Sequence, residues 1–235
     1  MPHNAVRRRA LLAAGGLAAG AFGLAQPSAA SAAATTEPTP TTPAEALRRL
    51  LAGNHRFVTG HPRHPHQTVE RLRELAAGQH PFLITLGCAD SRVPPELLFD
   101  QGLGDIFDNR VAGNEVDDLL LGSIEYAVEH FAPPVLMVLG HERCGAVTAT
   151  IEAIETGATA PGHIGAIVTA LRPIIEPVLD QPGDKVDNAV VANVKAQARA
   201  LVETSDIVRE KVEAGTLAVV GARYDLDTGR VTLVR

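Results

Sequence analysis

The sequence predicts an α/β protein with a mostly parallel β-sheet flanked by helices. Short apolar runs of strand length alternate with longer segments whose apolar residues recur at helical spacing. Hydrophobic residues make up 46% of the 235 residues, aromatic residues only 3%, and Trp is absent, so we expect a core of Ala, Val, Leu and Ile. That length suits one domain with a substantial core.

The first 34 residues have a composition of their own. Three arginines at 7–9 precede an apolar stretch at 10–25 and then a run of Ser and Ala, which is the order of a secretory signal peptide. Paired arginines followed by two leucines are typical of twin-arginine export signals. The apolar stretch is shorter than the roughly 20 residues that a membrane-spanning helix needs. We therefore expect residues 1–34 to be a cleaved twin-arginine-type signal peptide and the mature protein to be extracellular or in the cell envelope, without a stable membrane span.

A linker and an acidic domain are expected to follow. Residues 35–43 read TTEPTPTTP, a Pro/Thr-rich segment with no means of burying a core, so the folded domain should cover 44–235. Residues 1–34 contain three arginines and no acidic residue, so their removal leaves 18 basic and 27 acidic side chains, a net charge of −9. This balance argues against nucleic acid and anionic membrane surfaces as partners.

Helices and strands are expected to alternate through the domain. Thr42 and Pro43 supply a cap and a first-turn proline for a helix ending near Gly53 or shortly after, and a second helix should run from Thr68 to Ala77. The predicted strands cover 82–87, 105–111, 135–140, 217–221 and 231–234, and the other predicted helices cover 115–130, 146–156, 164–179 and 187–214. The strand, helix, strand order is a βαβ unit, and ligands bind such sheets at the carboxyl ends of the strands.

The two cysteines of the chain lie just beyond two of these predicted strands. Two cysteines in an exported protein would ordinarily predict a disulfide. Cys88 and Cys144, taken with His141, also form a set of two thiolates and one imidazole that leaves zinc an open fourth position, as in catalytic zinc sites. A His-x-x-Cys pair arises by chance as well. Spacing alone therefore leaves both alternatives open.

Asp90 and Arg92 follow the first cysteine closely. The carboxylate of Asp90 either binds the metal or accepts a hydrogen bond from water on the metal, and a two-bonded pair with Arg92 would keep it off the metal. The alternative is a local surface ion pair that contributes little stability. The position of the pair against a buried strand favours the functional interpretation.

These motifs carry a resemblance to a known family. Cys-Ala-Asp-Ser-Arg at 88–92, with His-x-x-Cys-Gly at 141–145, resembles the β-class carbonic anhydrases, and the similarity extends over residues 44–235. The resemblance implies the β-carbonic anhydrase fold with an N-terminal helical arm, one Zn²⁺ per chain, and reversible hydration of carbon dioxide to bicarbonate and a proton by zinc-bound hydroxide. It implies that Cys88, His141 and Cys144 hold the zinc. It also implies a homodimer or a tetramer.

The same resemblance implies roles for further residues. Asp90, fixed by Arg92, would orient the hydroxide. Gln79 matches a substrate-contacting amide, and the backbone amide of Gly145 matches an anion contact. Two aromatic residues, Phe107 and Tyr126, match positions that line the carbon dioxide pocket. On residue type alone, Gln79 is an ordinary loop residue and both aromatic residues are ordinary core.

Thr85 bears on the resting state of the site. Family members whose aspartate closes onto the zinc typically carry Trp three residues before the first cysteine, where this chain has Thr85. The resemblance therefore implies the open, plant-like arrangement, in which Asp90 is a metal ligand only in a closed state.

Three alternatives compete with these interpretations. Relatives on this fold with the same zinc site hydrolyse carbon disulfide or carbonyl sulfide, and a narrowed access route would indicate that activity. A non-catalytic zinc-binding protein is disfavoured by the Asp90–Arg92 pair. The cluster of His61, His64 and His66 is interpreted as a solvated loop rather than a metal site.

Overall fold

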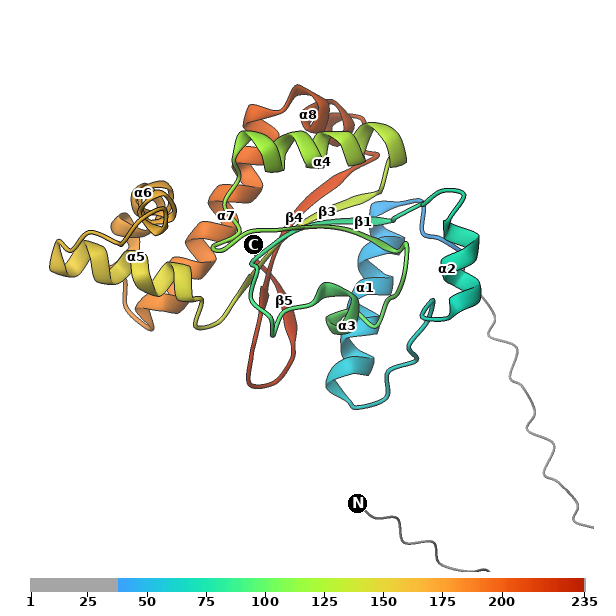
Figure 1. Ribbon diagram of the computed structural model, residues 1–235, viewed down its shortest axis with the longest axis horizontal. Helices are drawn as coiled ribbons and strands as arrows, with labels where there is room; N and C mark the ends of the chain where they lie inside the picture. The colour runs from blue at the N-terminus through green and yellow to red at the C-terminus, as the bar shows by residue number, and fades with distance from the viewer. Residues whose placement is uncertain (1–37, 235) are drawn as a thin grey trace, which may run out of the picture. The chain divides into compact units, whose positions relative to one another are not determined.

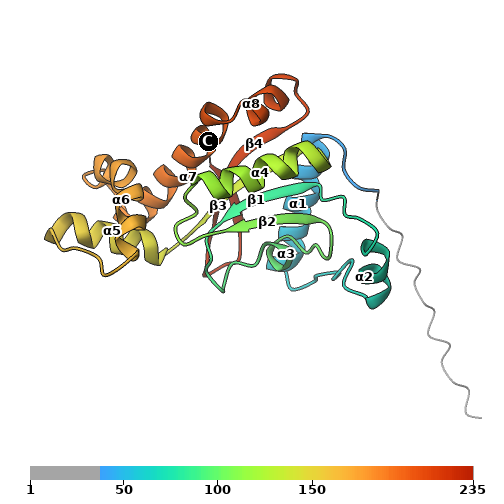
Figure 2. The same ribbon diagram turned by 45° about the horizontal axis from the view of Figure 1, so that its top comes forward.

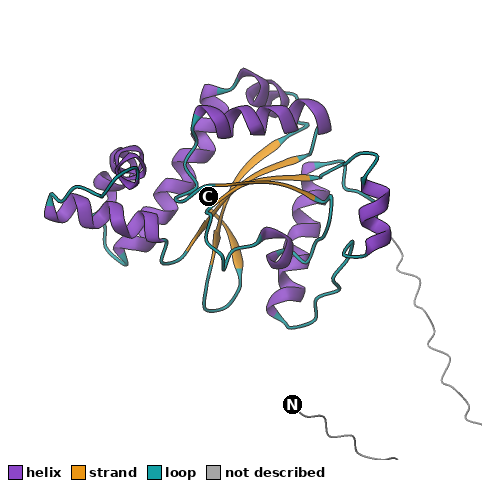
Figure 3. Ribbon diagram, viewed as in Figure 1, coloured by secondary structure: helices purple, strands orange, loops and turns teal. Residues whose placement is uncertain are grey.

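A five-stranded β-sheet organises residues 38–234, the part of the chain that the computed structural model describes (Figures 1 and 3). Its strands are β1 (Leu83–Gly87), β2 (Ile106–Arg110), β3 (Val135–His141), β4 (Ala218–Tyr224) and β5 (Val231–Val234). They lie in the order β2-β1-β3-β4-β5, and all pairings are parallel except that of β5 with β4. The predicted mostly parallel α/β fold is confirmed.

Helices cover both faces of this sheet (Figure 2). They are α1 (Pro43–Val58), α2 (Val69–Leu75), α3 (Pro95–Leu98), α4 (Asp118–Phe131), α5 (Gly145–Thr156), α6 (Ile164–Ile175), the 3₁₀ turn η1 (Glu176–Val178), α7 (Lys185–Thr204) and α8 (Asp206–Glu213). One face packs against α1 and α3, and the opposite face packs against α4, α7 and α8. Helices α5 and α6 lie beyond the carboxyl end of β3 and pack on α7.

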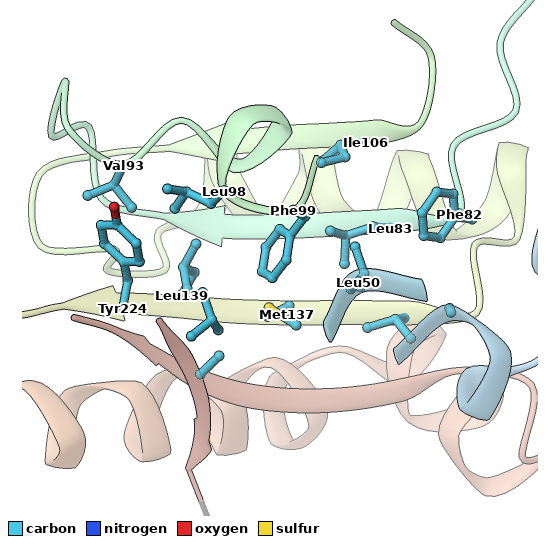
Figure 4. Close-up of a cluster of buried hydrophobic side chains, with 14 residues drawn as sticks. Leu50, Phe82, Leu83, Val93, Leu98, Phe99, Ile106, Met137, Leu139 and Tyr224 are labelled. Atoms are coloured by element: carbon cyan, nitrogen blue, oxygen red, sulfur yellow. The ribbon is translucent and has the colours of Figure 1, made fainter. Parts of the chain in front are cut away.

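The alternation of side chains along the strands divides the core into two layers. Leu83 of β1 and Met137 of β3 point into the layer under α1 and α3, where they meet Leu50 (Figure 4). Their neighbours Ile84 and Leu136 point into the opposite layer. Burial of both faces explains why these strands read as continuous apolar runs.

Several boundaries differ from the prediction. The single helix predicted at 187–214 is wrong, because Ser205 has extended backbone angles (φ −107°, ψ 115°) and separates α7 from α8. The first helix, expected to end near Gly53 or shortly after, continues to Val58, and it begins in a capping box between Thr42 and Glu45. The short helix α3 was not predicted.

The N-terminal predictions lie outside the described residues. The described residues begin at Pro38, so they include none of the predicted signal peptide and only the later part of the predicted linker. Between residues 38 and 234, no helix has both the length and the apolar character that crossing a bilayer requires.

Candidate metal centre

Three metal-binding side chains meet at the carboxyl edge of the sheet. Cys88 directly follows β1, His141 is the last residue of β3, and Cys144 is the N-cap of α5. Strands β1 and β3 are parallel neighbours, so their carboxyl ends lie at the same edge. One ligand atom from each side chain lies within 4.8 Å of the others, and all three residues are buried.

The state of these side chains suits a metal rather than a disulfide. Both cysteines are free, and their Sγ atoms are 4.0 Å apart, about twice the length of a disulfide bond. His141 Nδ1 donates a hydrogen bond to the Glu142 carbonyl oxygen (2.8 Å), which leaves Nε2 as the acceptor nitrogen. Among the described residues this buried Nε2 has no hydrogen-bond partner. Two thiols and one orphaned imidazole nitrogen form a donor set that fits zinc.

The thiols themselves are electrostatically unequal. The contact with Cys144 lowers the pKa of the Cys88 thiol far below its ordinary value, with help from His141 and the Gly113 amide. The same contact raises the pKa of the Cys144 thiol, although the amides of the first turn of α5 oppose that shift. Zinc binds thiolates, so the readily lost first proton of this pair of thiols favours metal binding.

Asp90 and Arg92 form the predicted pair beside the cluster. The Arg92 guanidinium donates through Nε to Asp90 Oδ1 (2.9 Å) and through Nη2 to Oδ2 (2.7 Å), and the Arg92 amide donates to Oδ1 as well (2.9 Å). These bonds hold the pKa of the Asp90 carboxyl well below its usual range. Asp90 Oδ2 lies 3.8 Å from His141 Nε2. An ionised, oriented carboxylate therefore faces the metal cluster.

Arg110 fixes the backbone that carries these residues. Located at the end of β2 opposite Gly87, Arg110 donates through Nε to the Cys88 carbonyl oxygen (3.0 Å) and through Nη2 to the Asp90 carbonyl oxygen. No role was assigned to Arg110 from the sequence. Its position at the end of the predicted strand next to β1 could have indicated a contact with the loop that carries Cys88.

The β4–β5 hairpin supports the loop between His141 and Cys144. The Glu142 carboxylate accepts from Arg223 Nη2 (2.5 Å) and from the Leu226 amide (3.0 Å). Arg143, at φ +50°, donates hydrogen bonds through Nη1 and Nη2 to the Asp227 carboxylate (2.9 and 2.8 Å). These side chains also went unassigned from sequence, because their partners lie more than 80 residues away.

The residues expected to bind substrate do not all reach the metal within one chain. Gly145, the first residue of α5, is exposed and adjoins Cys144. Phe107 and Tyr126 instead form an aromatic group with ring centroids 6.4 Å apart, and Phe107 pairs with Ile84 partway along β1. Gln79 precedes β1, at the opposite end of the strand from Cys88. The length of β1 at about 3.3 Å per residue separates Gln79 from the metal edge.

Comparisons with known proteins agree with this geometry. The carbonic anhydrase family model matches residues 83–231. Carbonic anhydrase 2 of Mycobacterium tuberculosis is 42% identical over 193 residues, covering 82% of this chain and 93% of that protein. A β-carbonic anhydrase structure from Aspergillus fumigatus is 30% identical, covers 81% of this chain and 89% of its own, and has a TM-score of 0.62. One of two tetrameric β-carbonic anhydrases from Sordaria macrospora is 25% identical, covers 81% and 97%, and has a TM-score of 0.65.

The family model spans the strands that carry the cluster, and the relatives match about four fifths of the chain. The cluster itself has the thiolate and imidazole donors of a zinc enzyme. Together these findings show that the chain belongs to the β-class carbonic anhydrases.

Proposed function

We propose that this carbonic anhydrase hydrates carbon dioxide reversibly to bicarbonate and a proton at one zinc held by Cys88, His141 and Cys144. The observation that carries the proposal is the buried, unpartnered His141 Nε2 beside two free sulfurs, all within 4.8 Å. Zinc, when bound, acts as a Lewis acid that brings the pKa of water near neutrality. Residues of this chain orient the water and bind the anion.

Asp90 orients the attacking water. An ionised carboxylate only accepts hydrogen bonds, so the Asp90 oxygen nearest His141 fixes the direction of the water's proton. Arg92 holds that carboxylate in a fork and keeps it from binding metal itself. Thr85 supports the open arrangement, since it is fully buried and hydrogen-bonds to Asp108 where closed relatives have Trp.

The start of α5 supplies an anion contact. Cys144 caps this 12-residue helix without a side-chain hydrogen bond, so the first amides of α5 are available to other acceptors. Among them, the amide of the exposed residue Gly145 can donate to an oxygen of bicarbonate.

A second subunit completes the pocket in this proposal. Gln79, Phe107 and Tyr126 lie away from their own chain's metal cluster, and Phe107 belongs to β2, an edge strand of the sheet. Exposed Leu119 and half-exposed Tyr126 add apolar surface there. The tetrameric relatives support a homodimer or tetramer in which one subunit lends these side chains to the other.

Complementation tests the shared pocket. Gln79→Ala and Cys144→Ser chains are each expected to be nearly inactive. When mixed and reassembled, they should regain about one quarter of the wild-type sites, because half the dimers hold one intact site. A mixture as inactive as its parents would contradict the shared pocket, provided that untagged Cys144→Ser chains copurify with tagged Gln79→Ala chains, which shows that mixed dimers form.

Stopped-flow hydration of carbon dioxide tests the function itself. We expect Asp90→Asn to keep one zinc per chain but to lose about 10²-fold or more in rate, as for removal of a proton-positioning group. Glu152→Gln, on an exposed face of α5, serves as the control and should match the wild type. Loss of zinc from Asp90→Asn would make Asp90 a resting ligand. Hydrolysis of carbon disulfide or carbonyl sulfide without carbon dioxide hydration would overturn the function.

Export by the twin-arginine route is part of the proposal. Its support is the order of arginines, apolar stretch and Ser/Ala run in residues 1–34. Replacing the paired arginines by lysine should retain the protein inside cells, as measured by fractionation. Equal export of the lysine variant would contradict the twin-arginine assignment.

A further inference from the structure

Two buried amide side chains lie on the apolar face of α7. Asn193 is 1% exposed and Gln197 is 4% exposed, and their neighbours on that face are the buried residues Val190, Val194 and Leu201. A buried amide is costly unless its polar atoms are hydrogen-bonded. Two of them, one helical turn apart, call for an explanation beyond packing.

Their hydrogen bonds form a continuous chain that ends on a zinc ligand. Gln197 accepts from the Val116 amide (3.1 Å) and donates to Asn193 Oδ1 (3.0 Å). Asn193 Nδ2 donates to the Gly113 carbonyl oxygen (2.8 Å). The Gly113 amide donates to Cys88 Sγ (3.4 Å). Asn193 and Gln197 of α7 are thereby connected to the metal cluster by hydrogen bonds through the turn at Gly113.

The turn at Gly113 is held in place from several sides. Gly113 has φ +84°, and the Asn114 amide closes the turn on the Val111 carbonyl oxygen (3.0 Å). A β-carbon at Gly113 would lie 3.0 Å from the Leu171 side chain and 3.2 Å from that of Ala146. Both the φ angle and the lack of space therefore require glycine here.

We propose that Asn193 and Gln197 are positioning residues that hold the Gly113 amide on the Cys88 sulfur and thereby tune the metal. An N–H···S bond draws electron density from a thiolate, so the sulfur donates less to the metal and the metal becomes a stronger Lewis acid. This reduction of electron donation matters more for a metal bound by two thiolates than for one bound by neutral imidazoles, because thiolates make the metal a weaker Lewis acid. This inference rests on the proposed zinc site but not on the reaction catalysed there.

The competing explanation is that the amides only satisfy one another in the core. Asn54 of α1 provides a matched control, because it is 4% exposed and lies in a different layer from the metal. Its Nδ2 donates to the carbonyl oxygens of Leu98 and Gly229, and its Oδ1 accepts from the Val231 amide. Asn54→Ala should cost stability like Asn193→Ala, but it should leave the metal unchanged.

Cadmium-113 NMR of the metal-substituted full chain tests the inference. In the wild type we expect a through-bond coupling between ¹¹³Cd and the Gly113 amide proton, which needs no variant. Asn193→Ala should weaken that coupling and shift the ¹¹³Cd resonance, Gln197→Ala should do so to a smaller extent, and Asn54→Ala should do neither.

The outcomes separate the two proposals. Absence of the coupling in the wild type, or an unshifted ¹¹³Cd resonance in a folded Asn193→Ala chain, would overturn the inference even if the enzyme hydrates carbon dioxide. A coupled, cadmium-loaded chain whose zinc form is inactive would overturn the proposed function and leave the inference standing.

Discussion

Gly53 of α1 faces the backbone of Phe99 so closely that a β-carbon at residue 53 would lie 1.8 Å from the Phe99 carbonyl oxygen. Gly53→Ala must therefore push α1 away from the end of α3. We expect it to lower the free energy of unfolding by about 2 to 3 kcal/mol, as measured by urea denaturation. The control is Gly165→Ala in α6, whose β-carbon would make an ordinary 3.5 Å contact with the Ala160 carbonyl oxygen. Equal effects at both positions would contradict this explanation.

Stability should depend on the ionisation of Asp100. Burial raises the pKa of this carboxyl, but hydrogen bonds from the Arg63 and His64 amides and from Arg56 outweigh burial, so the pKa is lowered. A lowered folded-state pKa means that the stabilisation is present above the unfolded pKa and is lost as pH falls through the folded pKa. We expect Asp100→Asn to cost about 1 to 3 kcal/mol at pH 7.

That cost should shrink as the medium becomes acidic, once pH falls below about 4, the unfolded pKa of Asp. Chemical denaturation at pH 7, 5 and 3 gives the difference between variant and wild type. Asn tolerates the positive φ of residue 100 (+47°), so backbone strain does not confound the comparison. Exposed Asp180→Asn is the control. A cost that stays constant down to pH 3 would contradict the assignment.

Ser205 joins α7, α8 and α4. Its hydroxyl oxygen accepts from the Val208 amide (3.1 Å) as the N-cap of α8, and the hydroxyl donates to Glu125 (2.6 Å) while being 1% exposed. Ser205→Ala should lower the free energy of unfolding by about 1 to 2 kcal/mol through loss of the cap. Ser205→Asp keeps a capping oxygen but places a second carboxylate beside Glu125, so it should not restore stability. Full restoration by Asp would show that capping alone matters.

Removal of a metal ligand should cost both metal and stability. Cys144→Ser replaces a soft thiolate by a hydroxyl, which is a poor zinc ligand, so we expect zinc content well below one per chain and a lower Tm. Elemental analysis and thermal unfolding measure these effects. Chelation of the wild type should release zinc and leave two titratable thiols. A disulfide in the isolated protein, with no zinc, would contradict the mechanism.

Short continuous apolar runs predicted the buried strands and helical apolar spacing predicted most of the helices of the described region, because burial on both faces of a sheet or on one face of a helix leaves a visible apolar pattern. The break at Ser205 escaped prediction since the apolar spacing continues from α7 into α8, and a single serine both ends one helix and caps the next. Helix α3 is only four residues long, too short to show a period.

Positions at or just beyond strand ends predicted that Cys88, His141 and Cys144 lie at one edge of the sheet, because parallel strand ends share an edge. That placement left a disulfide and a zinc site as alternatives, and the motif resemblance favoured zinc. The supporting contacts could not be predicted. Arg110 and Asn193 act through bonds to backbone carbonyl oxygens, which depend on three-dimensional register rather than on residue type. The sequence did contain one indication of a polar contact, because Asn193 and Gln197 place amide side chains among the apolar residues on one face of a helix.

The parallel pairing of β1 with β3 also sets an order of events during synthesis. Cys88 emerges from the ribosome more than 50 residues before His141, and the intervening chain includes the edge strand β2 and the crossover helix α4. A nascent chain that ends before residue 144 lacks a ligand, so it cannot complete the three-ligand cluster. A complete three-ligand site thus requires that the crossover has closed and that the central strands have paired, and a chain halted at α4 lacks two of the three ligands.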